Sequence, residues 1–128
     1  MIDASAAVQL ASSAAGFATL QGYELIAPPL LWSEGPSAIH QALARSAIER
    51  VHAEAALARF LAAPIMPRRP DELIHRAWTI ADALGWAKTY DAEYVALAEL
   101  AGCPLLTTDL RLARTVSGRI PVLEPPVR

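Results

Sequence analysis

Short apolar runs alternate with longer segments of helical periodicity, and this alternation constrains the fold more than any other feature of the chain. The runs lie at residues 1–3, 23–27, 104–108 and 119–125. Strands that alternate with helices in a small chain usually pair in parallel, so the pattern predicts a three-layer α/β/α sandwich with a short, mostly parallel sheet. A chain of 128 residues, 54% of them hydrophobic, predicts one globular domain over residues 1–128.

The segments between the runs predict helices. An Ala-rich helix is expected after Asp3. Apolar residues recur at three- and four-residue steps over residues 36–63, which predicts two helices that divide near Arg45 and Ser46. The proline-rich stretch 64–70 suits an edge strand or a loop. Further helices are predicted over residues 71–84, 89–101 and 110–116, the first two ended by Gly85 and Gly102.

Composition and charge exclude several classes of protein. The net charge of −2 argues against a protein that holds nucleic acid by phosphate neutralisation alone. No apolar run approaches the roughly 20 residues that a membrane span needs. The N-terminal residues MIDASAAVQL lack the positive start and apolar core of a signal peptide, which predicts a cytoplasmic protein. The lone Cys103 lies in an apolar run and is expected to be a buried, inert thiol.

Three aspartates are expected at one edge of the sheet. Asp3 follows the first apolar run, and Asp109 follows the run at 104–108. Ligands of parallel α/β sheets bind beyond the carboxyl ends of the strands, where both side chains would lie. Asp91 begins the helix before that run, and a helix antiparallel to its strand would bring Asp91 to the same edge. A simpler interpretation is that Asp3 and Asp109 cap helices and that Asp91 is a favourable first-turn acid.

A cluster of carboxylates at this edge predicts a divalent cation. Packed carboxylates repel one another, so one takes up a proton unless a cation lies among them. Mg²⁺ prefers oxygen ligands, and it can bind a phosphate oxygen and lower the pKa of a bound water. The pattern therefore favours metal-assisted phosphodiester hydrolysis. Ser5 and Thr107, each two positions from an aspartate, are expected to orient these ligands.

Three motifs carry a resemblance to a known family. MIDAS at the N-terminus, the acid in LLWSE, and TYDAEYVALAELAGCPLLTTDLRLAR at residues 89–114 resemble the PIN-domain ribonucleases, specifically the VapC-type toxins of bacterial toxin–antitoxin pairs. The resemblance covers nearly the whole chain and is most specific over residues 89–114. It implies an Mg²⁺- or Mn²⁺-dependent endoribonuclease, commonly a homodimer, that a cognate antitoxin inhibits. The family's acids fall on Asp3, Glu34, Asp91 and Asp109, and its hydroxyl before the last acid falls on Thr107.

The residues after Glu34 depart from the family pattern. The chain continues with Gly35 and Pro36, where the family more often has ordinary helix formers. A proline inside a helix costs about 3 kcal/mol because it removes a backbone hydrogen bond and clashes with the preceding turn. Either a helix starts at Pro36, or a kink lies beside the acid. The sequence leaves open whether Gly35 and Pro36 displace Glu34 from the aspartates.

Two other functions fit the same acids. A phosphatase or phosphotransferase would use Asp3 as its nucleophile, and it usually places a lysine near the site, whereas Lys88 is the only lysine in this chain. A non-catalytic module that binds a partner would need no metal, and the presence of all three aspartates argues against it.

Other charged and aromatic residues are expected to contact RNA, solvent, the core or a dimer partner. Arg111 and Arg114 follow Asp109 closely and are candidates to contact the RNA backbone. Glu93 lies about 200° round the helix from Asp91 and is predicted to be solvated or to face a dimer partner. Glu99 is predicted to lie on the surface. The aromatic residues Trp32, Trp78, Trp86, Tyr90 and Tyr94 are expected to pack in the core or at a dimer contact, with Trp32 also a candidate for the mouth of the site.

Overall fold

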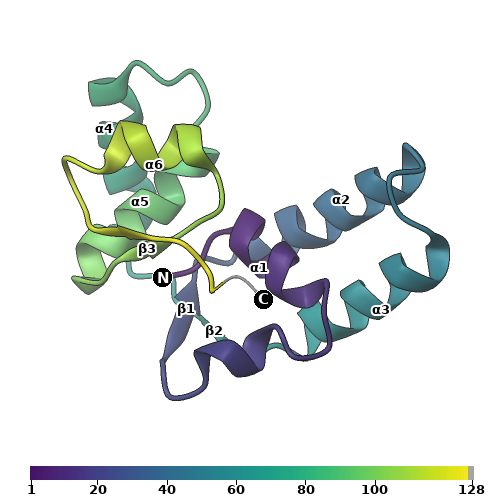
Figure 1. Ribbon diagram of the computed structural model, residues 1–128. Helices are drawn as coiled ribbons and strands as arrows, with labels where there is room; N and C mark the ends of the chain where they lie inside the picture. The colour runs from purple at the N-terminus through teal and green to yellow at the C-terminus, as the bar shows by residue number, and fades with distance from the viewer. Residues whose placement is uncertain (127–128) are drawn as a thin grey trace.

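The computed structural model of the protein, drawn in Figure 1, describes residues 1–126. Its helices are α1 (Ala4–Ala11), the short 3₁₀ helix η1 (Phe17–Leu20), α2 (Leu31–Ala44), α3 (Arg50–Leu61), α4 (Leu73–Leu84), α5 (Tyr90–Ala101) and α6 (Leu110–Val116). Its strands are β1 (Leu25–Ala27), β2 (Ile65–Pro67), β3 (Leu105–Leu106) and β4 (Val122–Leu123). None of the helices within residues 1–126 has the length and apolar character that crossing a bilayer requires.

The strands pair in parallel, as predicted. β1 pairs with β2, and β3 pairs with β4. Ile2 links the two pairs because it bridges Leu106 of β3 in parallel, and its N–H donates to the carbonyl of Ile26 in β1 at 3.0 Å. The order is therefore β2, β1, residues 1–3, β3, β4. The first apolar run contributes a single bridge at Ile2 in place of the expected strand.

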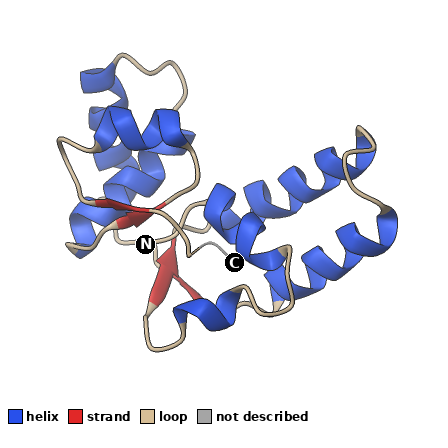
Figure 2. Ribbon diagram, in the orientation of Figure 1, coloured by secondary structure: helices blue, strands red, loops and turns tan. Residues whose placement is uncertain are grey.

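Helices cover both sides of these strands. Figures 1 and 2 show α4, α5 and α6 on one side of the strands and α1, α2 and α3 on the other. The core lies between them: Ile2 and Leu105 are fully buried, and α5 is buried from Tyr94 to Ala98. The predicted α/β/α arrangement is confirmed. Its consequence for the site is that Asp3 and Asp109 follow neighbouring segments of one sheet.

Several predicted boundaries are also confirmed. The break near Arg45 and Ser46 separates α2 from α3, and Ser46 has a φ of +60°. Gly85 and Gly102 end α4 and α5 in the left-handed conformation, with φ of +69° and +63°. The stretch 64–70 contains β2, which pairs with β1 alone, as suits a strand that includes proline.

Helix α2 differs from the prediction because it begins earlier. It starts at Leu31, so Glu34, Gly35 and Pro36 all lie inside it, and the prediction of a helix that starts at Pro36 is wrong. Packing explains why glycine is needed there. A Cβ on Gly35 would lie 2.3 Å from two ring atoms of Phe60 in α3. The glycine therefore allows α2 and α3 to approach closely at the turn that carries Glu34.

Candidate active site

Asp3 lies at the buried end of the candidate site, with 4% of its surface exposed. Its Oδ1 accepts hydrogen bonds from the N–H of Ala6 at 3.0 Å and from the hydroxyl of Ser5 at 2.7 Å. Its Oδ2 accepts a short hydrogen bond from the hydroxyl of Thr107. Burial raises the pKa of Asp3 above its ordinary value, and these hydrogen bonds offset part of that rise. The structure thus brings both predicted hydroxyl residues to this carboxylate.

The same hydroxyls connect α1 to the loop after β3. The Thr107 hydroxyl oxygen accepts from the N–H of Asp109 at 3.0 Å, and the Ser5 hydroxyl oxygen accepts from the N–H of Thr108, also at 3.0 Å. The two hydroxyl oxygens lie 3.2 Å apart. Ser5 contacts residues about a hundred positions away in the chain, and Thr107 contacts both Asp3 and Asp109, so these bonds hold Asp109 at a defined place beside the start of α1.

Helix capping applies to two of the three aspartates. Asp3 is the N-cap of α1, and Asp109 is the N-cap of α6, where its Oδ1 accepts two backbone N–H groups at 3.0 and 3.1 Å. Asp91 is different, because the N-cap of α5 is Thr89 and Asp91 lies in the first turn. Capping therefore accounts for one oxygen of Asp109 and leaves its Oδ2 available, and it does not account for Asp91.

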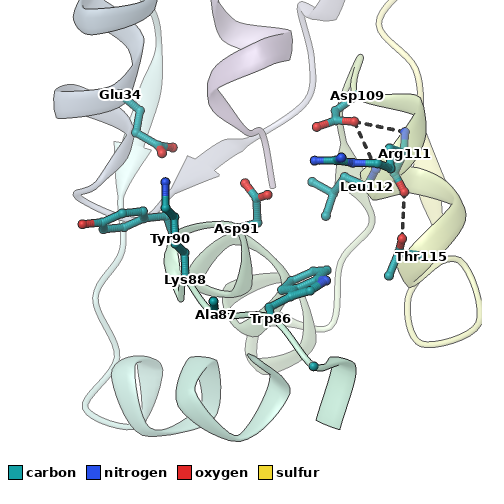
Figure 3. A pocket seen from close by; sticks show the side chains of 11 residues that line it. Glu34, Trp86, Ala87, Lys88, Tyr90, Asp91, Asp109, Arg111, Leu112 and Thr115 are labelled. Carbon is teal, nitrogen blue, oxygen red and sulfur yellow. Dashed lines mark hydrogen bonds between the residues drawn. The ribbon is translucent and has the colours of Figure 1, made fainter. Parts of the chain in front are cut away.

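Three of the predicted acids line one pocket. The pocket has a volume of about 710 Å³, and its lining includes Glu34, Asp91 and Asp109. Figure 3 shows Glu34 and Asp109 on opposite sides, with their carboxylates turned toward the space beside Asp91. Gly35 and Pro36 therefore do not remove Glu34 from the aspartates. Asp3 is not part of the lining and lies within electrostatic reach of Asp91 and Asp109.

Mutual repulsion marks this cluster. The pKa of Asp91 is raised above its ordinary value, first by burial and then by the negative charge of Glu34. Asp109 and Asp3 raise the pKa further, and Arg111 lowers it. The negative charges of Glu34, Asp109 and Asp3 thus all act on Asp91. A cation bound among these four acids would relieve their mutual repulsion.

Tyr94, predicted from the sequence to pack in the core or at a dimer contact, is also a member of the site. It is 1% exposed, and its hydroxyl donates to Oε1 of Glu34 at 2.7 Å. Burial and then the Glu34 carboxylate raise the pKa of Tyr94 above its ordinary value, so the hydroxyl remains a proton donor. Its position one turn after Asp91 on a predicted helix was the available signal.

The pocket also has basic and aromatic residues. The loop before α5 contributes Trp86 and Lys88, and α6 contributes Arg111. Figure 3 shows Trp86 and Arg111 beside the acids. Arg114, the other predicted RNA contact, is exposed on α6 and is not among the lining residues. The loop 85–89 was not expected at the site, because its sequence has no periodicity that assigns it to the sheet edge.

Two glutamates of α5 differ from their predicted surroundings. Glu93 is partly buried, and burial followed by the charge of Glu34 raises its pKa. It therefore lies nearer Glu34 than a solvated position implies. Glu99, predicted on the surface, is 17% exposed and forms ion pairs with Arg76 at 3.1 Å and Arg119 at 2.9 Å.

The aromatic residues also divide in a way the sequence did not indicate. Trp78 and Tyr90 are 64% and 52% exposed, so the prediction that they pack in the core is wrong for this chain. A dimer contact for them stays a prediction. Trp32 is partly buried and packs against the core.

The chemistry of the acids fits a hard divalent cation. Carboxylate oxygens are the ligands that such ions prefer, and the raised pKa of Asp91 reflects repulsion that a cation would relieve. Within residues 1–126, no three His, Cys, Asp or Glu side chains are gathered closely enough to hold an ion together. Mg²⁺ typically takes one or two carboxylates and keeps several waters. The residues therefore fit an ion with few direct protein ligands.

Fold and site together define an α/β/α protein with an acidic pocket at the carboxyl edge of a parallel sheet. The chain belongs to the PIN domain family, whose sequence model matches residues 1–117. This confirms the family that the motifs indicated.

The chain is also similar to proteins with a named activity. It is 36% identical over 121 residues to ribonuclease VapC12 of Mycobacterium tuberculosis, a match that covers 90% of each chain. It is 35% identical over 119 residues to ribonuclease VapC3 of the same organism, covering 89% of this chain and 85% of the relative. VapC ribonuclease Mb0985 of Mycobacterium bovis is 31% identical over 127 residues, covering 98% of each.

Proposed function

We propose that this protein is a VapC-type endoribonuclease that hydrolyses RNA phosphodiester bonds with Mg²⁺ or Mn²⁺. The observation that carries the proposal is the pocket in which Glu34 and Asp109 turn toward the space beside Asp91. The similarity to proteins named VapC ribonucleases supports the same activity. As part of the proposal, the protein is the cytoplasmic toxin of a toxin–antitoxin pair.

The proposed metal-binding acids are Asp91, Asp109, Glu34 and Asp3, of which one or two would contact the cation directly and the others would act through its bound waters. Asp109 uses Oδ1 for its cap and has Oδ2 available. Asp3 accepts three hydrogen bonds, and a carboxylate has about four lone-pair sites, so one site is left for a ligand. When bound, a divalent ion supplies neutralising charge and a water of lowered pKa for attack on phosphorus.

The other pocket residues suit a substrate with a phosphate backbone. Four acids repel phosphate, so binding depends on positive charge at the pocket. Arg111 and Lys88 line its two sides, one from α6 and one from the loop before α5, and they are proposed to contact phosphates. Trp86 offers an aromatic face on which an unpaired base can stack. Arg114, which lies outside the pocket lining, is proposed only for a more distant phosphate.

A phosphatase is less well supported by the same structure. That reaction needs Asp3 as a nucleophile, whereas Asp3 is 4% exposed and both of its oxygens accept hydrogen bonds. A purely non-catalytic module gives no reason for a cluster of acids whose charges raise the pKa of Asp3 and of Asp91.

Two partners belong to the proposal. A cognate antitoxin would inhibit the protein by placing a basic side chain in the acidic pocket. A second copy of the chain would form a homodimer, and Ile74 and Trp78, one turn apart on α4 and 48% and 64% exposed, are candidates for that contact.

The direct test is cleavage of mixed RNA by the purified protein with Mn²⁺ or with EDTA. We expect cleavage with Mn²⁺, none with EDTA, and none with the Asp109→Asn variant. Asparagine caps helices about as well as aspartate, so this variant should keep α6 and the fold, which circular dichroism would check. Asp82→Asn, at an exposed position of α4 outside the pocket, is the matched control and should cleave normally.

The outcomes separate the alternatives. Cleavage by Asp109→Asn at the wild-type rate would contradict the assigned site, because it would point to a contaminating nuclease or to other residues. Release of phosphate from a small phosphomonoester, without RNA cleavage, would favour the phosphatase.

A further inference from the structure

A buried hydrogen bond connects two layers of the protein at the candidate site. Tyr94 lies on α5 and Glu34 on α2, 60 residues apart in the chain, and 2.7 Å separates the phenol oxygen from Oε1 of Glu34. Figure 1 shows α2 and α5 on opposite sides of the strands. The aspartates are held by α1, α5 and the loop after β3, so Glu34 is the one acid of the four that comes from α2. The bond therefore ties the acid of α2 to α5, the helix that carries Asp91.

We propose that Tyr94 is a positioning residue that holds the carboxylate of Glu34 toward the pocket, with Oε2 available to a divalent cation. This inference rests on the proposed function, because it concerns the cation of that site. Within residues 1–126, the bond from Tyr94 is the hydrogen bond that the structure gives to the Glu34 side chain.

The phenol has a chemical advantage over a basic residue in this place. An arginine or lysine would orient Glu34 and would also neutralise it, which would weaken the attraction for a cation. A phenol donates a hydrogen bond and carries no charge, so Glu34 keeps its full negative charge. The near-complete burial of Tyr94 also fixes the position of the phenol.

The surroundings of Glu34 show what the bond prevents. Glu93 lies within electrostatic reach of both Glu34 and Arg69. The charges of Asp91 and Glu93 both repel the Glu34 carboxylate, so a freed Glu34 side chain would favour rotamers that increase these separations. The backbone of Glu34 is already restrained, since Phe60 packs against Gly35. The hydrogen bond from Tyr94 restrains the rotation of the Glu34 side chain.

The test compares Tyr94→Phe with the wild-type protein by titration of Mn²⁺ in a calorimeter, without RNA. Loss of a group that orients a ligand typically weakens metal affinity by 10–100-fold, and we expect a loss of about that size. RNA cleavage should fall by a similar factor at limiting Mn²⁺ and recover at high Mn²⁺. Tyr23→Phe, whose ring is 74% exposed, is the matched control and should bind Mn²⁺ normally.

A double-mutant cycle separates positioning from a general structural effect. In the Glu34→Gln background, Tyr94→Phe should cause no further loss of Mn²⁺ affinity, because its effect acts through Glu34. An equal loss in both backgrounds would overturn the inference, as would unchanged affinity in Tyr94→Phe itself. If Tyr94→Phe fails to fold, Glu34→Asp provides the test. The aspartate side chain is one methylene shorter than glutamate and cannot keep the hydrogen bond to Tyr94. Undiminished Mn²⁺ affinity in this variant would again overturn the inference.

The inference and the proposed function fail in different ways. A wild-type protein whose Mn²⁺ affinity depends on Glu34 and Tyr94, and which cleaves no RNA, would contradict the nuclease activity and leave the positioning role. A protein that cleaves RNA, with Mn²⁺ affinity independent of Tyr94, would do the reverse. A protein that binds no Mn²⁺ would remove both.

Discussion

The two ends of α5 carry carboxylates in opposite electrostatic situations. At the N-terminal end, Asp91 faces Glu34 and Asp109, and the ion pairs within residues 1–126 include none to Asp91. At the other end, about 12 Å away by helical rise, Glu99 is held between Arg76 and Arg119. One helix therefore carries one acid that repels its neighbours and one that is neutralised.

The helix dipole affects the two acids in opposite ways. An acid is unfavourable at the C-terminus of a helix, so Glu99 needs its two arginines to be stable there. The N-terminus of a helix favours an acid, but repulsion from the three further acids around Asp91 lowers the stability of the folded protein. An arrangement that works against stability and also lines a pocket indicates selection for binding. The Glu99 end serves the fold, and the Asp91 end is the better candidate for function.

The two ends of α5 are expected to differ most in their effect on RNA cleavage. Asp91→Asn should lower the kcat/KM of Mn²⁺-dependent cleavage by at least about 100-fold, or about 2.7 kcal/mol, because it removes a proposed ligand. Glu99→Gln, assayed where it remains folded, should leave kcat/KM near the wild-type value. Similar losses in both variants would mean that the two ends do not differ in function.

Stability should show the reverse order. Glu99→Gln should lower the free energy of unfolding by about 1–2 kcal/mol, because two arginines lose their charged partner. The expected loss of unfolding free energy is small because the side chains of Arg76 and Arg119 are 42% and 35% exposed. Urea denaturation would measure it, with Asp82→Asn as the control. A loss no larger than that of the control would show that these ion pairs contribute little.

The smallest expected effect is a pH-dependent gain from Asp91→Asn in EDTA. The pKa of Asp91 is raised in the folded protein, so the folded state binds the proton more tightly than the unfolded chain. Stability from this group is present at low pH and is lost as pH rises from about 3.8 through the raised pKa. Asparagine cannot ionise, so the variant should be more stable than wild type by up to about 0.5 kcal/mol.

Comparing the two proteins at two pH values sharpens this expectation. The advantage of Asp91→Asn should be larger at pH 7 than at pH 4, and saturating Mn²⁺ should reverse it at pH 7, because only the wild-type protein gains from binding the ion. A wild-type protein more stable than the variant at pH 7 in EDTA would show that Asp91 is not repelled by its neighbours.

Most of the helices, several of their ends and the edge of the sheet that carries the aspartates could be predicted from the sequence alone. Alternating short runs and helical segments predicted the parallel α/β/α fold, and the glycines Gly85 and Gly102 predicted two helix ends. Strand ends placed Asp3 and Asp109 at one edge, and the helix direction added Asp91. These inferences succeed because periodicity, capping and turn chemistry depend on residues within a few positions of one another.

The contacts between side chains that are distant in the sequence could be identified only from the tertiary structure. The sequence left open whether Gly35 and Pro36 displace Glu34; in the structure α2 continues through Pro36, and the Tyr94 hydroxyl donates to Glu34. The partners of Glu99 come from positions 20 and 23 residues away, and the loop with Trp86 and Lys88 reaches the pocket. Such contacts depend on how the layers pack. No local pattern encodes them, because the residues that meet share no turn, strand or helix.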